Sequence, residues 1–388
     1  MKRKLVITTY ENKIITSLIE NDEIAEFHVS ENANAYRLGS IYIGRVKKIV
    51  SNIRAAFIEI GKGMECYYDM DEKGSLPIHV GDAFMVQISK EAMKTKQPSV
   101  TRRISLAGKY CVLTKGDGRI GLSNKIPSEK RETLKKLLEP YICEEYGFII
   151  RTNAKDCPSE ELQKEAERLA KEYEKLKKIS ETRVCFSCLK EAPPPYIVDL
   201  KNIYQEGLTE IVVEDARLYE EIKGYLSEEQ PEDMGKLRFY KDKLLPLSKL
   251  YSIEARIQNA LKEKVWMKSG AYLVIQPTEA LTVIDVNTGK CIGKKKDDKV
   301  YFKINVEAAK EAAKQIRLRN LSGIILIDFV NLESKDKMEE LLEAFRNYLH
   351  QDPVQTTLVD MTKLQLVEVT RKKVRKPLDE ALKYSEER

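Results

Sequence analysis

The sequence is poor in the side chains that many enzymes use for proton transfer, zinc binding or covalent cross-links. Its 388 residues include only three histidines, at positions 28, 79 and 350. Its seven cysteines are scattered and odd in number, a pattern that favours free thiols in a reducing compartment over a disulfide framework. We therefore expect a cytoplasmic protein in which imidazole chemistry plays little part.

Long apolar runs are also missing from the sequence. No stretch approaches the roughly 18 apolar residues of a membrane span, and the short apolar run after the basic N-terminus is broken by Thr8, Thr9 and Glu11. We expect neither a membrane-spanning helix nor a secretory signal. The charge is mixed, with 67 Lys+Arg against 61 Asp+Glu and a net charge of +6. This mixed charge is compatible with nucleic-acid binding but does not by itself predict it.

What the chain does contain is a succession of different hydrophobic patterns, which predicts an α+β multidomain fold. Residues 4–30 form apolar runs separated by turn residues, as in an antiparallel meander. Residues 39–106 predict about five short strands, which indicates a small barrel of the oligonucleotide-binding kind. Residues 158–176 have a helical period with one apolar stripe. Residues 210–240 predict a strand, helix and strand that could complete the first sheet, and from about residue 262 the pattern becomes α/β.

Two aspartates close apolar strand segments in this last part. Alternate side chains of a strand share a face, so Asp285 and Asn287 project together from the segment 281–287. Asp328 closes an apolar run that predicts a core strand, where a carboxylate is costly to desolvate unless it is paired, hydrogen-bonded or bound to a metal. The carboxyl ends of strands in open α/β sheets form the ligand crevice. Both aspartates are therefore expected at one crevice.

Two carboxylates without a neighbouring histidine or cysteine suit a hard cation. Mg²⁺ takes one or two carboxylates and completes its shell with water and phosphate oxygens, and Mn²⁺ is an alternative ion. The competing interpretation is structural: each aspartate caps a strand end or pairs with a lysine or arginine, and spacing alone favours this. Zinc is not expected, because Cys185 and Cys188 form an isolated CxxC pair and structural zinc needs four ligands.

Several strings in a fixed order resemble the catalytic core of the ribonuclease E/G family, more closely the G-type than the E-type. They extend over nearly the whole chain and comprise Arg54–Gly61, Ile104–Gly108, Gly147–Thr152, Pro277–Lys290, Arg317–Gly323 and Ile327–Phe329. The resemblance implies a discontinuous RNase H-like subdomain with an inserted S1 barrel and 5′-sensor region, followed by a DNase I-like catalytic domain. The implied boundaries are 1–35 and 195–262 for the RNase H-like subdomain, 36–108 for the S1 domain, 109–194 for the 5′-sensor region and 263–388 for the catalytic domain.

The resemblance also implies roles for individual residues. Asp285 and Asp328 match the family's metal-binding aspartates, and Asn287 matches the asparagine that contacts the scissile phosphate. The other matches are the RNA-binding residues of the S1 barrel, Phe57, Tyr67 and Lys96, and a pocket for a 5′-monophosphate formed by Arg151, Thr152 and Arg371. An arginine fork with a hydroxyl suits a terminal phosphate. Without the family, Phe57 would be assigned to core packing and Arg151 to plain surface.

The implied activity is Mg²⁺-dependent cleavage of single-stranded RNA, in rRNA or tRNA processing or in mRNA decay. A metal-activated water would leave 5′-phosphate and 3′-hydroxyl ends. The alternative is a non-catalytic S1-type RNA-binding protein, and a weaker one is a DNA-directed nuclease. The family usually continues after Leu378 into a paired-cysteine zinc link and a small domain, but no cysteine follows Cys291. A homo-oligomer of this chain is therefore not expected to form through the family's zinc link.

Overall fold

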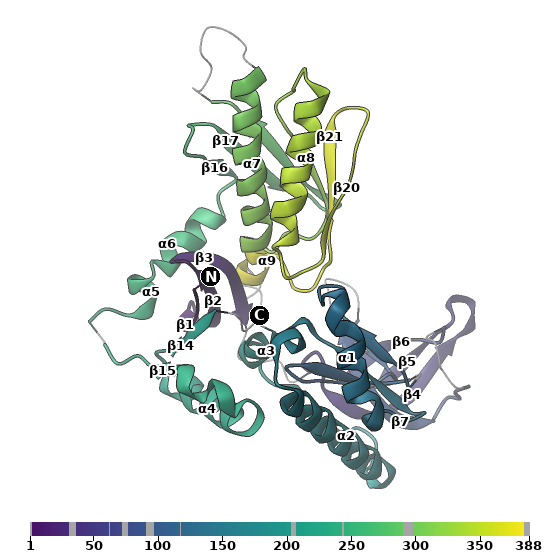
Figure 1. Cartoon of the computed structure of the whole chain (residues 1–388). Helices are drawn as coiled ribbons and strands as arrows, with labels where there is room; N and C mark the ends of the chain where they lie inside the picture. Colours follow the sequence, from purple (N-terminus) through teal and green to yellow (C-terminus); the bar gives the residue numbers. More distant parts are fainter. Residues whose placement is uncertain are drawn as a thin grey trace. The chain divides into compact units, whose positions relative to one another are not determined.

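The computed structural model describes residues 2–30, 36–61, 63–71, 77–90, 97–116, 118–202, 207–242, 244–289 and 298–383. The chain divides into two units, Met1–Asn32 with Glu206–Arg388, and Ala33–Gln205. The second unit is thus an insertion between two segments of the first, as the colours of Figure 1 show along the chain. Within the described ranges, no helix is both long and apolar enough to cross a lipid bilayer.

The inserted unit contains a closed five-stranded barrel, which confirms the barrel predicted from its short strands. The strands pair in ring order, and the last closes onto the first: β4 (Ile41–Val50), β5 (Ala55–Glu59), β6 (Glu65–Asp69), β8 (Ser99–Thr101) and β7 (Ala83–Lys90). Side chains such as Ile58, Tyr68 and Val86 fill the interior and are fully buried. Because side chains alternate along a strand, the residues between them face outward.

The described part of the inserted unit also contains a second sheet and three α-helices. Its four strands pair in the order β11 (Ile120–Leu122), β12 (Tyr146–Ile150), β10 (Cys111–Lys115) and β9 (Ser105–Ala107), and the short β13 (Cys188–Lys190) adds to β4 of the barrel. The helices are α1 (Ser128–Leu138), α2 (Ser159–Thr182) and α3 (Pro195–Asn202). The predicted amphipathic helix is confirmed as α2, whose buried stripe includes Leu162, Leu169 and Tyr173.

The longer unit begins with a sheet built from both of its chain segments. The strand order is β15 (Leu237–Phe239), β14 (Leu208–Val213), β1 (Arg3–Tyr10), β2 (Lys13–Glu20) and β3 (Glu23–Ser30). The predicted meander is confirmed, and both of its turns are two residues long with positive φ, as right-twisted hairpins require. The segment after residue 207 completes this sheet as predicted, with α4 (Ala216–Glu229) between its strands, and α5 (Leu247–Leu250) and α6 (Ile253–Ala260) follow.

The second sheet of the longer unit has helices on one face. Its order is β16 (Lys264–Trp266), β17 (Tyr272–Pro277), β18 (Leu281–Asn287), β19 (Gly323–Asp328), β21 (Leu366–Arg371) and β20 (Thr356–Met361). Among the described strands of this sheet only the β18–β19 pair is parallel, and α7 (Asp298–Leu318) lies between these two strands in the sequence. In Figure 1, α7 and α8 (Lys335–His350) lie over the same side of the sheet, and α9 (Leu378–Lys383) ends the described chain. We call the side without α7 and α8 the open face.

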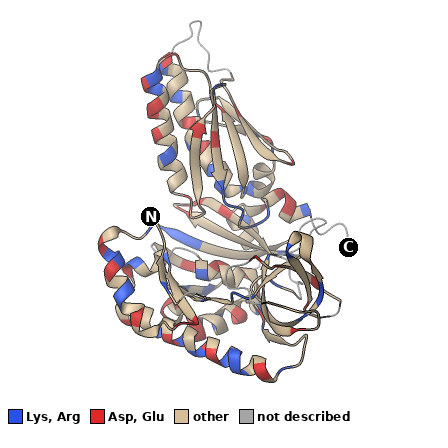
Figure 2. Cartoon of the chain, turned by 90° about the vertical axis from the view of Figure 1, so that its right-hand side faces the viewer, with Lys and Arg blue, Asp and Glu red and all other residues tan. Residues whose placement is uncertain are grey.

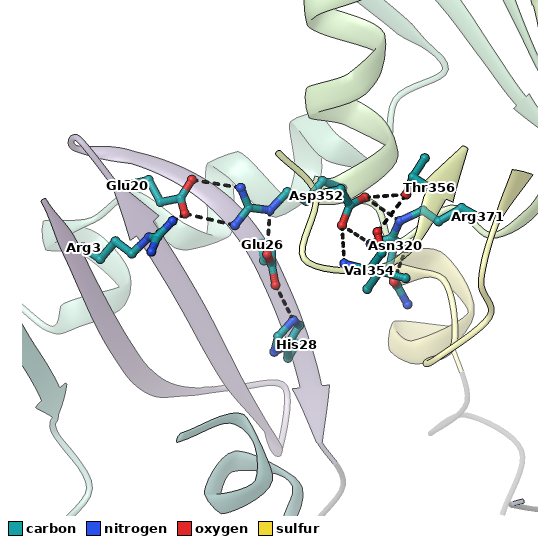
Figure 3. A network of polar contacts seen from close by, with 10 residues as sticks. Arg3, Glu20, Glu26, His28, Asn320, Asp352, Val354, Thr356 and Arg371 are labelled. Atoms are coloured by element: carbon teal, nitrogen blue, oxygen red, sulfur yellow. Dashed lines mark hydrogen bonds and ion pairs between the residues drawn. The ribbon is translucent and has the colours of Figure 1, made fainter. Parts of the chain in front are cut away.

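A buried ionic cluster connects α7 to the first sheet of the same unit. The Arg317 guanidinium donates to Glu20 at 2.9 and 3.0 Å and to Glu26 at 2.6 Å. Arg3 also donates to Glu20 at 2.9 Å, and His28 hydrogen-bonds Glu26 at 2.9 Å (Figure 3). These side chains are all largely buried. Since a buried charge is costly without a partner, the cluster makes the end of α7 dependent on β2 and β3.

The free energy of unfolding is expected to fall in acid through this cluster. Burial favours the neutral form of Glu26, but the contacts with His28 and Arg317 outweigh it and hold the pKa of Glu26 well below its ordinary range. A carboxyl with a depressed folded-state pKa stabilises the fold above its unfolded pKa of about 4.3, and this contribution is lost as the pH falls below that value. Urea unfolding at about pH 7 and about pH 3 should show a smaller acid loss for Glu26→Gln than for wild type. Equal losses would contradict this role.

Candidate active site

The candidate site lies at the carboxyl ends of the two parallel strands of the second sheet. β18 alternates regularly, so Ile284 is fully buried on the helix side while Asp285 and Asn287 project from the open face. In β19, Ile327 is fully buried on the helix side and Asp328 projects from the open face. The alternation of apolar and polar residues therefore fixes the direction of all three polar side chains.

The register of the strands brings the two aspartates together. Asp285 and Asp328 are direct partners in the β18–β19 ladder. Their Cα atoms are therefore one strand spacing apart, about 4.8 Å, with both side chains on the same face. The Asn287 Nδ2 donates a hydrogen bond of 2.6 Å to the Asp285 Oδ2, which orients that carboxylate. The predicted meeting of these three residues is confirmed.

The surroundings of the aspartates are less buried than the sequence predicted. Asp285 is half-buried and Asp328 is exposed, because both side chains project from the open face. Partial burial first, and the charge of Asp285 second, raise the pKa of Asp328 above its ordinary value. The desolvation cost expected for a core strand is therefore smaller here. Repulsion between two neighbouring carboxylates remains, and a bound cation would relieve it.

The described residues give no support to the interpretation in which each aspartate pairs with a lysine or arginine. Among the residues that the structure describes, no lysine or arginine pairs with Asp285 or Asp328. The same residues contain no cluster of three or more histidine, cysteine or acidic side chains that could hold a metal alone. A cation at this position would take two carboxylates and fill its shell with water or phosphate oxygens. This donor set fits Mg²⁺ or Mn²⁺ and does not fit zinc.

The open face carries two further carboxylates that the sequence did not single out. Glu368 on β21 pairs across the ladder with Asp360 on β20, and on its other side with Leu326, two residues before Asp328. Figure 2 shows acidic residues on the strands of this sheet. The alternation within Leu366–Arg371 predicts the face on which Glu368 lies. The position of β21 between β19 and β20 cannot be predicted from the sequence.

The barrel carries an aromatic pair on its outer surface. Phe57 on β5 and Tyr67 on β6 are direct ladder partners, with ring centroids 6.4 Å apart and an edge-to-face angle of 81°. Both are half-buried, so Phe57 is not part of the barrel core, which spacing alone had favoured. Lys48, which sequence reasoning missed, lies opposite Phe57 on β4 and is exposed. Lys96, the predicted phosphate-binding lysine, lies outside the described residues.

The family resemblance implies that this aromatic pair binds RNA, so loss of the Tyr67 ring is expected to weaken RNA binding. Stacking of a base on an aromatic side chain contributes about 1–3 kcal/mol, so Tyr67→Ala should raise the Kd for a single-stranded RNA roughly 10-fold. Tyr67→Phe keeps the ring face and should bind within about two-fold of wild type. Fluorescence anisotropy of a labelled oligonucleotide measures both constants. Identical affinity of the alanine and phenylalanine variants would remove the stacking role.

Arg151 and Thr152 lie where β12 ends, in the inserted unit. The Arg151 Nη1 donates to the Gly108 carbonyl at 2.6 Å, and its Nη2 donates to the Asn202 Oδ1 at 2.6 Å. The Thr152 hydroxyl is 2.9 Å from the Ser123 hydroxyl. Both residues are half-buried. The guanidinium and the hydroxyl are thus held at one strand end by neighbouring polar groups, which suits a small anion site.

Arg371, the third residue predicted for this pocket, belongs to the longer unit. It is 4% exposed, and its guanidinium donates to the Asp352 carboxylate at 2.7 and 3.3 Å and to the Asn320 Oδ1 at 2.7 Å (Figure 3). It also donates to the Leu321 carbonyl at 3.1 Å. These contacts are those of a structural ion pair, and they give no support to a phosphate-binding role for Arg371.

Comparison of the sequence with known proteins relates the chain to one family. Residues 105–374 match the model of the ribonuclease E/G family. The chain is 33% identical to ribonuclease G of Salmonella typhimurium over 98% of its own length and 82% of that protein. It is 32% identical to ribonuclease G of Haemophilus influenzae over 98% of its own length and 81% of that protein, and 31% identical to ribonuclease E of Nostoc sp. over 96% and 56%. The chain therefore belongs to the ribonuclease E/G family.

Proposed function

We propose that this chain is a cytoplasmic endoribonuclease that cleaves single-stranded RNA with a divalent metal held by Asp285 and Asp328. The observation that carries the proposal is the direct pairing of these carboxylates in one ladder, with Asn287 beside them and no basic partner in the described part of the chain. The substrate class comes from the relatives, which are named ribonuclease G and ribonuclease E. The aromatic pair on the barrel supports single-stranded RNA as the ligand.

The proposed cleavage takes place on the open face, at the two aspartates. Bound between the two carboxylates, Mg²⁺ would activate a water for attack on phosphorus and neutralise charge in the transition state, leaving 5′-phosphate and 3′-hydroxyl ends. Asp285 and Asp328 would hold the ion, and water or phosphate oxygens would complete its coordination. Asn287 holds the Asp285 carboxylate in position through its amide N–H. In this proposal the same amide also contacts the scissile phosphate, which is the role that the family resemblance implies.

A cleavage assay with matched substrates tests this proposal. Single-stranded RNA, double-stranded RNA and single-stranded DNA of one sequence are incubated with the protein and Mg²⁺, with and without EDTA. We expect cleavage of the single-stranded RNA alone, abolished by EDTA, with product ends that a 5′-phosphate-dependent ligase accepts. Binding of RNA without cleavage would establish the non-catalytic alternative, and preferred cleavage of DNA would establish a DNA-directed nuclease.

The proposal includes sensing of a 5′-monophosphate by Arg151 and Thr152. A charge-assisted hydrogen bond contributes about 1.5–3 kcal/mol, so Arg151→Ala should lower kcat/KM on 5′-monophosphorylated RNA by roughly 10-fold or more. The rate on 5′-hydroxyl RNA should change far less, because that end offers no phosphate. Both rates are measured on oligonucleotides that differ only at the 5′ end. An equal loss on both substrates would show that Arg151 acts through its contacts with Gly108 and Asn202 instead.

A further inference from the structure

An exposed aromatic pair lies on the edge of the sheet that carries the two aspartates. Trp266, on β16, is the only tryptophan of the chain and is 61% exposed. Its direct ladder partner is Tyr272 on β17, and the two ring centroids are 5.0 Å apart at an interplanar angle of 56°. Met267, the next residue along the chain, is the one that points into the core, with 8% exposure. The Trp266 ring therefore contributes little to core packing.

A lysine is held against both rings. The Lys264 Nζ lies 4.2 Å from the Trp266 centroid and 3.5 Å from the Tyr272 centroid. Lys264 is two residues before Trp266 on the same strand, so both side chains share a face. A cation over an aromatic face is attracted by the ring electrons, so Lys264 favours this arrangement of the two rings. The three residues, which we call the aromatic platform, thus present ring surface and positive charge together on the surface of the molecule.

The strand register places the platform beside the candidate active site. Tyr272 pairs directly with Asn287, and Val274, the ladder partner of Lys264, pairs directly with Asp285. Direct ladder partners share a face, so the platform, Asn287 and the two aspartates all project from the open face. Two strand spacings, about 10 Å, separate β16 from β18. An extended ligand bound at the carboxylates can therefore reach the rings with a neighbouring group.

We propose that the aromatic platform stacks the base of a nucleotide that flanks the cleaved bond of single-stranded RNA, while Lys264 neutralises a neighbouring phosphate. This inference rests on the proposed function, since it assumes that RNA reaches Asp285 and Asp328. Single-stranded nucleic acids are bound through this combination of aromatic ring faces and basic side chains, because every base has a π-face and every linkage a negative charge. The platform lies on the same face as a site proposed for a phosphodiester, and this favours RNA over a protein as its ligand.

The single tryptophan allows a direct binding test. Full-length Asp328→Asn protein, which should bind RNA without cleaving it, is titrated with unlabelled single-stranded RNA while tryptophan emission is followed, and anisotropy of labelled RNA gives the binding curve. We expect saturable quenching with the same midpoint as the anisotropy. An abasic nucleotide next to the cleavage position should relieve the quenching, and double-stranded RNA should not produce it. RNA binding without quenching, or quenching that abasic sites leave unchanged, would overturn the platform.

Kinetic variants separate stacking from a structural role. Trp266→Ala should raise KM about 10-fold, and Trp266→Tyr should restore it to within about two-fold of wild type. Leu244→Ala removes a 97% exposed apolar side chain from the same unit and should leave KM unchanged. An unchanged KM in Trp266→Ala, with RNA still cleaved, would overturn the platform and leave the proposed function standing. If wild type neither binds nor cleaves RNA, this result contradicts both the proposed function and the role of the platform.

Discussion

Asp328→Asn is expected to lower kcat/KM for RNA cleavage by about 10³-fold, and Asp285→Asn by a similar factor. Each substitution removes one of the two carboxylates that face each other across the β18–β19 ladder. An amide of the same shape keeps the strand packing but not the charge that a divalent ion requires. Steady-state cleavage of a single-stranded RNA measures the loss. RNA affinity by anisotropy should stay within about three-fold of wild type, because the barrel surface is untouched.

The matched control for this loss is Asp336→Asn, which also removes one aspartate from the same unit. Asp336 is exposed in the first turn of α8 and has no part in the open face. Its activity should be that of wild type. A similar loss in all three variants would show that the effect is not specific to the open face. Full activity in both Asp285→Asn and Asp328→Asn would remove the candidate site.

Arg317→Met is expected to cost about 3–5 kcal/mol in the free energy of unfolding, because it leaves Glu20 and Glu26 buried without their cation. For a unit of this size the loss corresponds to a fall in Tm of about 10 °C. The change is local to the contact between α7 and strands β2 and β3. Urea unfolding and thermal melting followed by circular dichroism measure both quantities.

Lys314→Met provides the control for this cluster, one turn earlier on α7. The Lys314–Glu23 pair has a distance of 2.6 Å, but its side chains are 39% and 66% exposed. An exposed ion pair contributes less than about 1 kcal/mol, so this variant should melt close to wild type. Equal destabilisation by the two substitutions would contradict the claim that burial makes Arg317 important.

The direction of the acidic side chains could be predicted from the sequence, because it depends only on alternation along one strand. Asp285 and Asn287 are two residues apart and must share a face. The direct pairing of Asp285 with Asp328 does not follow from alternation along one strand. The sequence of α7 separates the two strands, and their register is set by packing across the whole sheet. The degree of burial was predicted incorrectly for Asp328. The apolar run predicts a strand covered on both faces, whereas β19 has one covered face and one open face.

Contacts between residues that are far apart in the sequence, or on different strands, could not be predicted. The family resemblance assigns Arg371 to the 5′-phosphate pocket, yet its burial depends on Asp352, which lies beyond the end of α8. Lys48 lies beside Phe57 only because β4 and β5 pair across a bulge. Trp266 and Tyr272 are six residues apart in sequence, and only the β16–β17 register makes them neighbours. Each of these features is a cross-strand contact, which local patterns do not encode.

The central claim, that Asp285 and Asp328 jointly hold the metal that cleaves RNA, is tested most directly by the Mg²⁺ dependence of single-turnover cleavage. Wild type, Asp285→Asn and Asp328→Asn are compared over a range of Mg²⁺ concentrations at saturating protein. We predict that either substitution raises the Mg²⁺ concentration for half-maximal rate by about 10-fold or more, whereas Asp336→Asn leaves it unchanged. The same midpoint in all four proteins would contradict the assignment of these carboxylates as metal ligands.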